Sequence, residues 1–226
     1  MKEALWMRPE LSDFFPVWDK LKNEERKILL ESAEMRHSQA GEMIHNGSEG
    51  CEGLLCLVSG QLRAFILSEE GREISIYRLL EGDICLFSAS CMMSGIQFDI
   101  FVEAEKTSSY FVIPASVYKK IMEESAVLAN FTNELMAARM SYVMWLIGQI
   151  LWKGFDRRLA SFLLEESAMD GTDDLYITHE KIADHLGTAR EVVTRMLRYF
   201  QSEGLVQLSR SHIVLKKREG LEKLAG

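Results

Sequence analysis

Apolar and polar residues alternate differently in successive parts of the chain, and each pattern predicts its own kind of structure. Residues 12–34 carry Leu21, Ile28 and Leu29 at helical spacing. From about residue 38 to 113, short apolar runs alternate with glycine-containing turns, as in "LRAFILSEEGREISIYRL". Runs of this length and spacing are typical of an antiparallel sandwich or barrel, and "SEEGRE" has the composition of a hairpin turn.

After Pro114 the pattern becomes helical. The stretch "SVYKKIMEES" predicts a short helix, and residues 126–154 predict a long one without proline. Six apolar residues of the long helix follow a 3–4 alternation: Leu128, Phe131, Leu135, Ala138, Tyr142 and Trp145. This alternation is typical of the seam of a two-helix coiled coil. The alternative is a core helix that packs on its own β domain.

Residues 177–206, "ITHEKIADHLGTAREVVTRMLRYFQSEGLV", contain two short helical patterns separated by Gly187. Thr178 can cap the first helix, and Gly187 permits a tight turn. Thr188 with Glu191 three residues later has the arrangement of a capping box for the second helix. A helix over 156–167 precedes this stretch, "LVQLS" and "HIVLKK" follow as a two-stranded wing, and a short tail ends the chain.

The second of these helices, residues 189–203, has one apolar and one polar face. Val193, Met196, Leu197 and Phe200 form the apolar face. The polar face carries Arg190, Glu191, Thr194, Arg195 and Arg198. In a major groove, arginine can hold guanine through two hydrogen bonds, and glutamate can accept one from cytosine. The alternative is a solvated charged helix face, but turn, core positions and wing together indicate a winged helix-turn-helix.

Charge is distributed unevenly along the 226 residues, whose formal net charge is −8. From Thr172 onward there are nine Lys/Arg against eight Asp/Glu, so the acidic excess lies in the preceding part. This balance favours an acidic sensor or partner-binding body joined to a small DNA-contacting tail. The N-terminal residues lack the apolar run of a signal peptide, and the longest apolar stretch, 142–152, is too short to span a bilayer. We therefore expect a cytoplasmic protein without membrane contact.

These phrases, in this order, resemble the Crp/Fnr transcription regulators over nearly the whole chain. The resemblance rests on "LVSGQLRAFILSEEGREISIYRLLEGD", the long helix, "RRLASFLL" and the helix-turn-helix phrase. It implies an α+β fold: an N-terminal antiparallel β roll of jelly-roll or cupin-like type, a long dimerisation helix and a C-terminal winged helix-turn-helix. We expect domain bounds of 1–125, 126–153 and 154–226. The resemblance also implies a homodimer that binds palindromic promoter DNA, RNA polymerase as a partner, and no enzymatic activity.

The resemblance assigns roles to individual residues. Arg190, Glu191 and Arg195 match the Arg-Glu-x-x-x-Arg positions with which the cyclic-AMP receptor branch reads a TGTGA-like half-site. Thr194 departs from the glycine of that branch and resembles the hydroxyl residue of the Fnr branch. The remaining candidates, Thr178, His179 and Arg198, are expected to contact phosphates, which fix register rather than sequence.

Cyclic AMP is not expected as the effector. Members that bind it carry a glutamate where this chain has Phe87, and an Arg-Ser pair where it has Phe98 and Asp99. Between Gly82 and Lys106 there is no arginine or lysine to neutralise a phosphate. An apolar effector pocket is one hypothesis, with Leu86, Phe87, Met92, Met93, Phe98 and Phe101 as lining and Met144 or Trp145 as closure; a filled core is the other.

Other sensor chemistries find weaker signals. The four cysteines form no disulfide framework, and neither Cys51 with Cys56 nor Cys85 with Cys91 has the CxxC spacing of iron–sulfur or zinc sites. They are expected to be buried apolar residues, with a thiol switch at Cys85 and Cys91 as the alternative. His37 and His45, the two sensor-side histidines and the candidate haem ligands of a gas-responsive regulator, are expected at the surface. A cupin-like metal enzyme would need clustered histidines, and the β region has no His-x-His pair.

Overall fold

The computed structural model describes residues 10–47, 53–86 and 99–226 of the chain. It divides into two compact units, which are described separately here. Unit 1 comprises residues 1–66 and 76–141, and unit 2 comprises residues 67–75 and 142–226. The long helix α3 (Ala126–Trp152) contributes residues to both.

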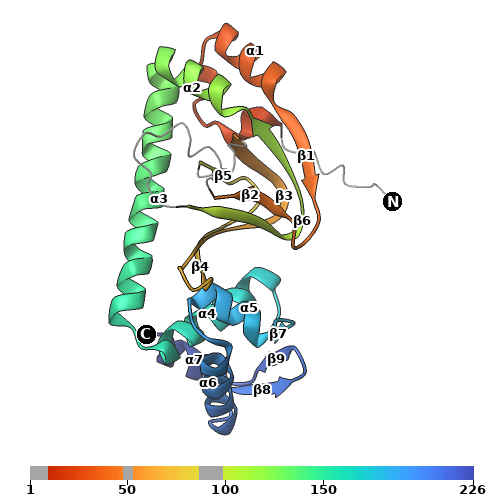
Figure 1. Cartoon of the computed structure of the whole chain (residues 1–226), viewed down its shortest axis with the longest axis vertical. Helices are drawn as coiled ribbons and strands as arrows, with labels where there is room; N and C mark the ends of the chain where they lie inside the picture. The colour runs from red at the N-terminus through yellow and green to blue at the C-terminus, as the bar shows by residue number, and fades with distance from the viewer. Residues whose placement is uncertain (1–9, 48–52, 87–98) are drawn as a thin grey trace. The chain divides into compact units, whose positions relative to one another are not determined.

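Unit 1 is built around an antiparallel sheet (Figure 1). Its strands are β1 (Glu34–Ser38), β2 (Met43–Asn46), β3 (Leu54–Leu67), β4 (Glu73–Leu79), β5 (Ile84–Cys85) and β6 (Phe101–Ile113). The main path runs β1-β6-β3-β4, with β2 paired to β6 and β5 paired to β3. The turn between β3 and β4 is the predicted "SEEGRE" hairpin, in which Gly71 has a positive φ of 76°.

The long strands β3 and β6 are buried on both faces, so polar side chains there need partners. Arg63 is fully buried, and its Nε lies 2.9 Å from Oε1 of Glu103, its cross-strand neighbour. Arg78 makes a second such pair with Glu105, also at 2.9 Å. These pairs keep buried charges compensated, because an unpaired charge in such a site is costly.

Short helices close one end of the unit 1 core. They are the 3₁₀ turns η1 (Leu11–Phe14) and η2 (Trp18–Lys20) and the helices α1 (Asn23–Ser32) and α2 (Ala115–Glu124). Leu21 and Leu29 are buried, as the helical pattern predicts, whereas Ile28 remains 45% exposed. His45 on β2 is buried and His37 on β1 is exposed, so the expectation that both lie at the surface is wrong for His45.

The N-terminal half of α3 packs on this core rather than facing outward. Leu128 is fully buried, and Phe131 and Leu135 pack against the same cluster of apolar residues. Leu128, the first residue of the predicted coiled-coil seam, therefore belongs to the core of unit 1, and the next two seam residues pack partly on it. The alternative of a helix packed on its own β domain holds for them, because they lie on the face that covers the roll's apolar core.

Unit 2 contains the predicted helix-turn-helix with more regular structure around it than the pattern indicates. Its elements are α4 (Phe155–Asp170), β7 (Asp174–Leu175), α5 (His179–Leu186), α6 (Arg190–Ser202), β8 (Val206–Ser209), β9 (His212–Leu215) and α7 (Arg218–Ala225). The wing is a three-stranded sheet in the order β7-β9-β8, not the two-stranded ribbon expected. The short tail is a helix, because Leu221 is fully buried in the core of the unit.

Candidate nucleic-acid interface

The first helix of the helix-turn-helix begins and ends as its sequence predicts. Thr178 is the N-cap of α5, and its side-chain oxygen accepts a hydrogen bond from the Lys181 amide at 3.1 Å. Gly187 ends the helix with φ 64° and ψ 45°, the left-handed conformation that glycine adopts without steric cost. Ile182 and Ala183 are buried, so this helix has the fixed support that a second helix needs.

The second helix begins one residue later than predicted. α6 starts at Arg190, and its N-cap is Ala189, which has extended φ and ψ and no side-chain oxygen to cap with. The prediction that Thr188 caps this helix in a capping box with Glu191 is therefore wrong. Without a capping side chain, the first amides of α6 are left available for a phosphate or water.

The two faces of α6 differ sharply in exposure. Val193, Leu197 and Phe200 are fully buried in the core of the unit. The opposite face is charged: Arg190, Glu191, Arg195 and Arg198 are all exposed. Four of the five polar-face candidates therefore share one accessible helix surface, while the fifth, Thr194, is only partly exposed.

Thr194 is held by two hydrogen bonds. Its hydroxyl donates to the carbonyl oxygen of Arg190 at 2.9 Å, and Nδ1 of His179 lies 2.9 Å from the same hydroxyl oxygen. Because a hydroxyl has one hydrogen, His179 must donate through Nδ1–H for both bonds to form. Thr194 thus links α6 to the first turn of α5. The bond to Arg190 had a sequence signal, because a threonine can bond back to the carbonyl four residues before it, whereas the bond to His179 joins two helices and had none.

His179 lies in a positive environment. Partial burial, together with the guanidinium groups of Arg190 and Arg198, lowers the pKa of His179 from its usual value of 6.5. The imidazole is therefore neutral at pH 7, with Nδ1–H directed to Thr194. Arg190 also has an acidic neighbour, since its Nε lies 3.9 Å from Oε2 of Glu180, and both side chains are well exposed. At that exposure the ion pair is weak and can be exchanged for other partners.

The wing presents further polar and aromatic groups that the sequence pattern did not single out. Its turn contains Arg210, which is exposed, and Ser211, whose φ of 53° is left-handed. Beside the turn, the ring of His212 stacks on that of Tyr176 with centroids 4.5 Å apart, and its Nε2 lies 3.0 Å from Oδ1 of Asp174. Tyr176 is 81% exposed, so a large flat surface is available next to α5.

The candidate effector residues lie in different environments. Leu86 is buried in the core of unit 1, whereas Asp99 is exposed. Trp145 is half-exposed and contacts the ring of Tyr142 with centroids 5.4 Å apart. Four of the candidates lie outside the described residues: Phe87, Met92, Met93 and Phe98.

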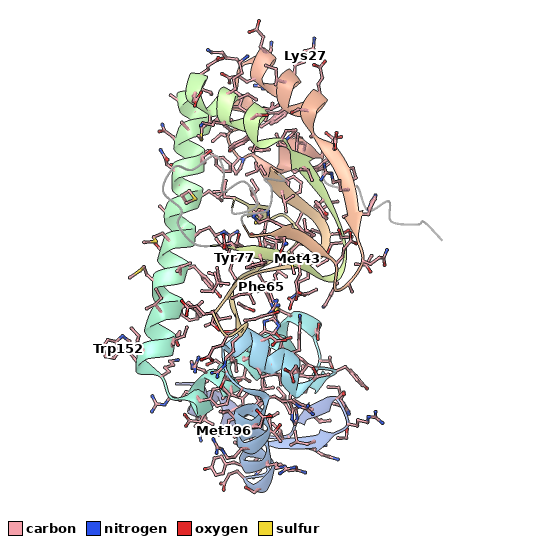
Figure 2. The ribbon with its side chains drawn as sticks, in the orientation of Figure 1. Lys27, Met43, Phe65, Tyr77, Trp152 and Met196 are labelled. Carbon is pink, nitrogen blue, oxygen red and sulfur yellow. The ribbon has the colours of Figure 1, made fainter. Side chains whose placement is uncertain are left out.

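The cysteines of the described part are enclosed. Cys85 is buried, with Sγ 3.2 Å from the hydroxyl oxygen of Tyr77, which is labelled in Figure 2. Burial also raises the pKa of the Cys56 thiol well above its ordinary value. A buried thiol is a poor nucleophile, which weighs against a redox role for Cys85; Cys91 lies outside the described residues. Among residues 10–47, 53–86 and 99–226, no group of three His, Cys, Asp or Glu could hold a metal ion.

Comparison with known proteins agrees with this geometry. Residues 157–224, which include both helices and the wing, match the Crp-like helix-turn-helix domain. The crystal structure of a Crp/Fnr-family protein from Eubacterium rectale ATCC 33656 superposes with a TM-score of 0.93, at 55% identity over 94% of this chain and 99% of that one. The chain belongs to the Crp/Fnr family.

More distant relatives are named as regulatory proteins. The fumarate and nitrate reduction regulatory protein of Yersinia pestis is 26% identical over 195 residues, which are 83% of this chain and 77% of that protein. The global nitrogen regulator of Synechococcus elongatus is 26% identical over 186 residues, 78% of this chain and 83% of that protein. This Crp/Fnr protein is accordingly a DNA-binding transcription regulator and not an enzyme, as its sequence predicts, and α6 lies within the matched helix-turn-helix domain.

Proposed function

We propose that two copies of this chain bind a palindromic promoter site, each reading one half-site with α6. The observation that carries this proposal is the face of α6 on which Arg190, Glu191, Arg195 and Arg198 are all exposed, opposite a fully buried apolar face. The first turn of such a helix is the part that reaches base edges in a major groove. Arg190 and Glu191 lie in that turn, and Arg195 lies a little over one turn further along.

The surface for a second copy is a stripe along α3 that differs from the one predicted. Five exposed residues of α3 follow one another at spacings of three and four residues: Ala137, Met140, Met144, Ile147 and Leu151. Their alternation is that of a coiled-coil seam, and it lies on the face opposite Leu128 and Leu135. We call these five residues the outer stripe of α3. A second copy of the same helix would bury it, in the two-fold arrangement that a palindromic site requires.

A membrane is the competing partner for this helix. By length and composition, α3 is apolar enough to cross a bilayer. However, Leu128 and Thr132 are buried by unit 1, and Arg139 pairs with Asp83 at 3.3 Å, which ties the helix to a polar domain. We therefore favour a cytoplasmic protein in which protein, not lipid, covers the outer stripe. Contact with RNA polymerase follows from the family resemblance and belongs to the same proposal.

The sensor function is less constrained. Asp99 stands where cyclic-AMP-binding members would place the end of their Arg-Ser pair, so an anionic phosphate would meet a carboxylate there. We propose that the roll does not bind cyclic AMP and that any effector is of another chemical class.

Selection from a random duplex library tests the DNA-reading proposal. The purified full-length protein, without added ligand, is mixed with the library at fixed salt, and the retained sequences are read. We expect a palindrome whose half-sites resemble TGTGA or TTGA and lie about one helical turn apart. Retention of unrelated sequences, or of a single unpaired motif, would contradict the proposal.

A further inference from the structure

The side chain of Thr194 has one polar and one apolar branch, and the structure treats them differently. The hydroxyl hydrogen is donated to the Arg190 carbonyl, and the hydroxyl oxygen faces Nδ1 of His179. The hydroxyl thus has no hydrogen left for a base acceptor such as N7 or O6 of guanine. The hydroxyl therefore cannot donate to a base unless its bond to the Arg190 carbonyl is broken.

The methyl group takes part in neither hydrogen bond. Thr194 is partly exposed on the same helix face as Glu191 and Arg195, which the proposed function places in the major groove. A threonine methyl in that groove is a suitable contact for the C5-methyl group of thymine, the one apolar feature among base edges there. The two hydrogen bonds also restrict the side-chain rotamer, so the methyl is held in one direction.

On this geometry, and resting on the proposed function, we infer that Thr194 selects thymine through its methyl group, with His179 as the residue that positions it. His179 does not need to touch the base. It holds the hydroxyl toward the protein, from the first turn of α5, and so decides which branch of Thr194 faces the groove.

Two nearly isosteric substitutions test the methyl group and the hydroxyl group of Thr194 separately. Thr194→Val keeps the methyl group and replaces the hydroxyl with a second methyl, whereas Thr194→Ser keeps the hydroxyl and removes the methyl. Library selection with the full-length wild-type protein first locates the thymine preferred in each half-site. Affinities are then measured for the selected duplex with thymidine or deoxyuridine at that position, because deoxyuridine differs only in lacking the C5-methyl group.

We expect deoxyuridine to weaken binding of wild type and of Thr194→Val by a similar factor, about three- to tenfold, which is near the lower end of the cost of a full base-pair change because only one methyl group is lost. Thr194→Ser should bind both duplexes equally. The inference is overturned if Thr194→Val becomes indifferent to the methyl group while Thr194→Ser still responds, or if wild type binds both duplexes equally. The wild-type comparison needs no substitution, so a folding defect in a variant cannot hide the answer. Failure of the wild-type selection to enrich any motif would instead overturn the proposed function, and this inference with it.

Discussion

At the scale of single residues, the two nitrogens of His179 have separate roles. Nδ1–H bonds to Thr194, which leaves Nε2 for a partner outside the protein. Partial burial and the nearby Arg190 and Arg198 lower the pKa of His179, so the unbound protein carries a neutral imidazole there at pH 7. A neutral Nε2 can only accept a hydrogen bond, whereas a DNA phosphate offers only acceptors. A phosphate contact at His179 therefore favours the protonated ring.

This arrangement predicts that DNA binding takes up a proton. A nearby phosphate raises the pKa of His179 from its lowered value in the unbound protein, so bound protein holds more protons and affinity rises as pH falls. The gain develops as pH falls through the pKa of the DNA-bound ring and is complete below the lowered pKa of the unbound ring. We expect about two- to tenfold tighter binding at pH 6 than at pH 8, since one pKa unit corresponds to a factor of ten. Fluorescence anisotropy at constant ionic strength measures the DNA affinity at each pH.

His179→Gln is the matched control, because glutamine can donate a hydrogen bond but does not titrate. Its affinity should vary much less with pH across the same range. An equal pH dependence in the variant and in wild type would assign the proton to another group and remove His179 from the phosphate contact.

At the scale of elements, α3 is the predicted long helix, but its sequence pattern does not say which of its faces packs on the β roll. Its apolar residues surround it, so a 3–4 alternation can be drawn through more than one face. The seam predicted from the sequence begins with Leu128, Phe131 and Leu135, which pack on the β roll. Which apolar residues of α3 remain exposed, as those of the outer stripe do, depends on tertiary contacts that the sequence pattern does not contain.

Two arginine substitutions on α3 distinguish these faces. Ile147 and Tyr142 are each 42% exposed, but only Ile147 belongs to the outer stripe, and Tyr142 belongs to the seam predicted from the sequence. Ile147→Arg should shift the protein to a monomer in sedimentation equilibrium and weaken binding to a full palindrome, because like charges would meet across the two-fold axis. Tyr142→Arg should leave both unchanged. If Tyr142→Arg became monomeric and Ile147→Arg did not, the seam predicted from the sequence would be the dimer interface, and the outer stripe would not.

The helix-turn-helix was predictable because its signals are local. Thr178 caps α5 through an amide three residues away, and Gly187 turns the chain by its own backbone conformation. Features that depend on distant contacts were missed: the tail becomes α7 because Leu221 enters a core built by α4 and α6, and the His179–Thr194 bond joins two helices. The cap at Thr188 failed since Ala189, not the threonine, adopts the extended N-cap conformation.

At the scale of the whole molecule, the charge pattern assigns different tasks to different stretches of the chain. The last 55 residues, from Thr172, carry nearly balanced charge and present arginines on α6 and at the wing. The acidic excess precedes them, where it would repel DNA and other polyanions. Sequence-specific contacts rather than net charge therefore have to provide a large share of the affinity.

The same charge pattern predicts that cyclic AMP is not an effector. The stretch from Asp83 to Glu105 contains no lysine or arginine, and the nearby Arg139 is paired with Asp83. Millimolar cyclic AMP should leave the melting temperature unchanged, and affinity for the selected palindrome should not move. A ligand that binds the folded protein raises the melting temperature by mass action, so a clear upward shift would show that the roll binds it after all.

The central claim is that α6 reads bases, and one comparison tests it directly. Library selection and affinity measurements are carried out in parallel with wild type, Arg195→Ala and Arg198→Ala at one salt concentration. Arg195→Ala should cost about 1–3 kcal/mol on the selected site and relax the preference at one base per half-site. We propose that Arg198 contacts a phosphate, so Arg198→Ala should weaken binding to all sequences alike. An Arg195→Ala variant that loses affinity equally for every sequence, with its base preferences intact, would contradict base reading by this helix.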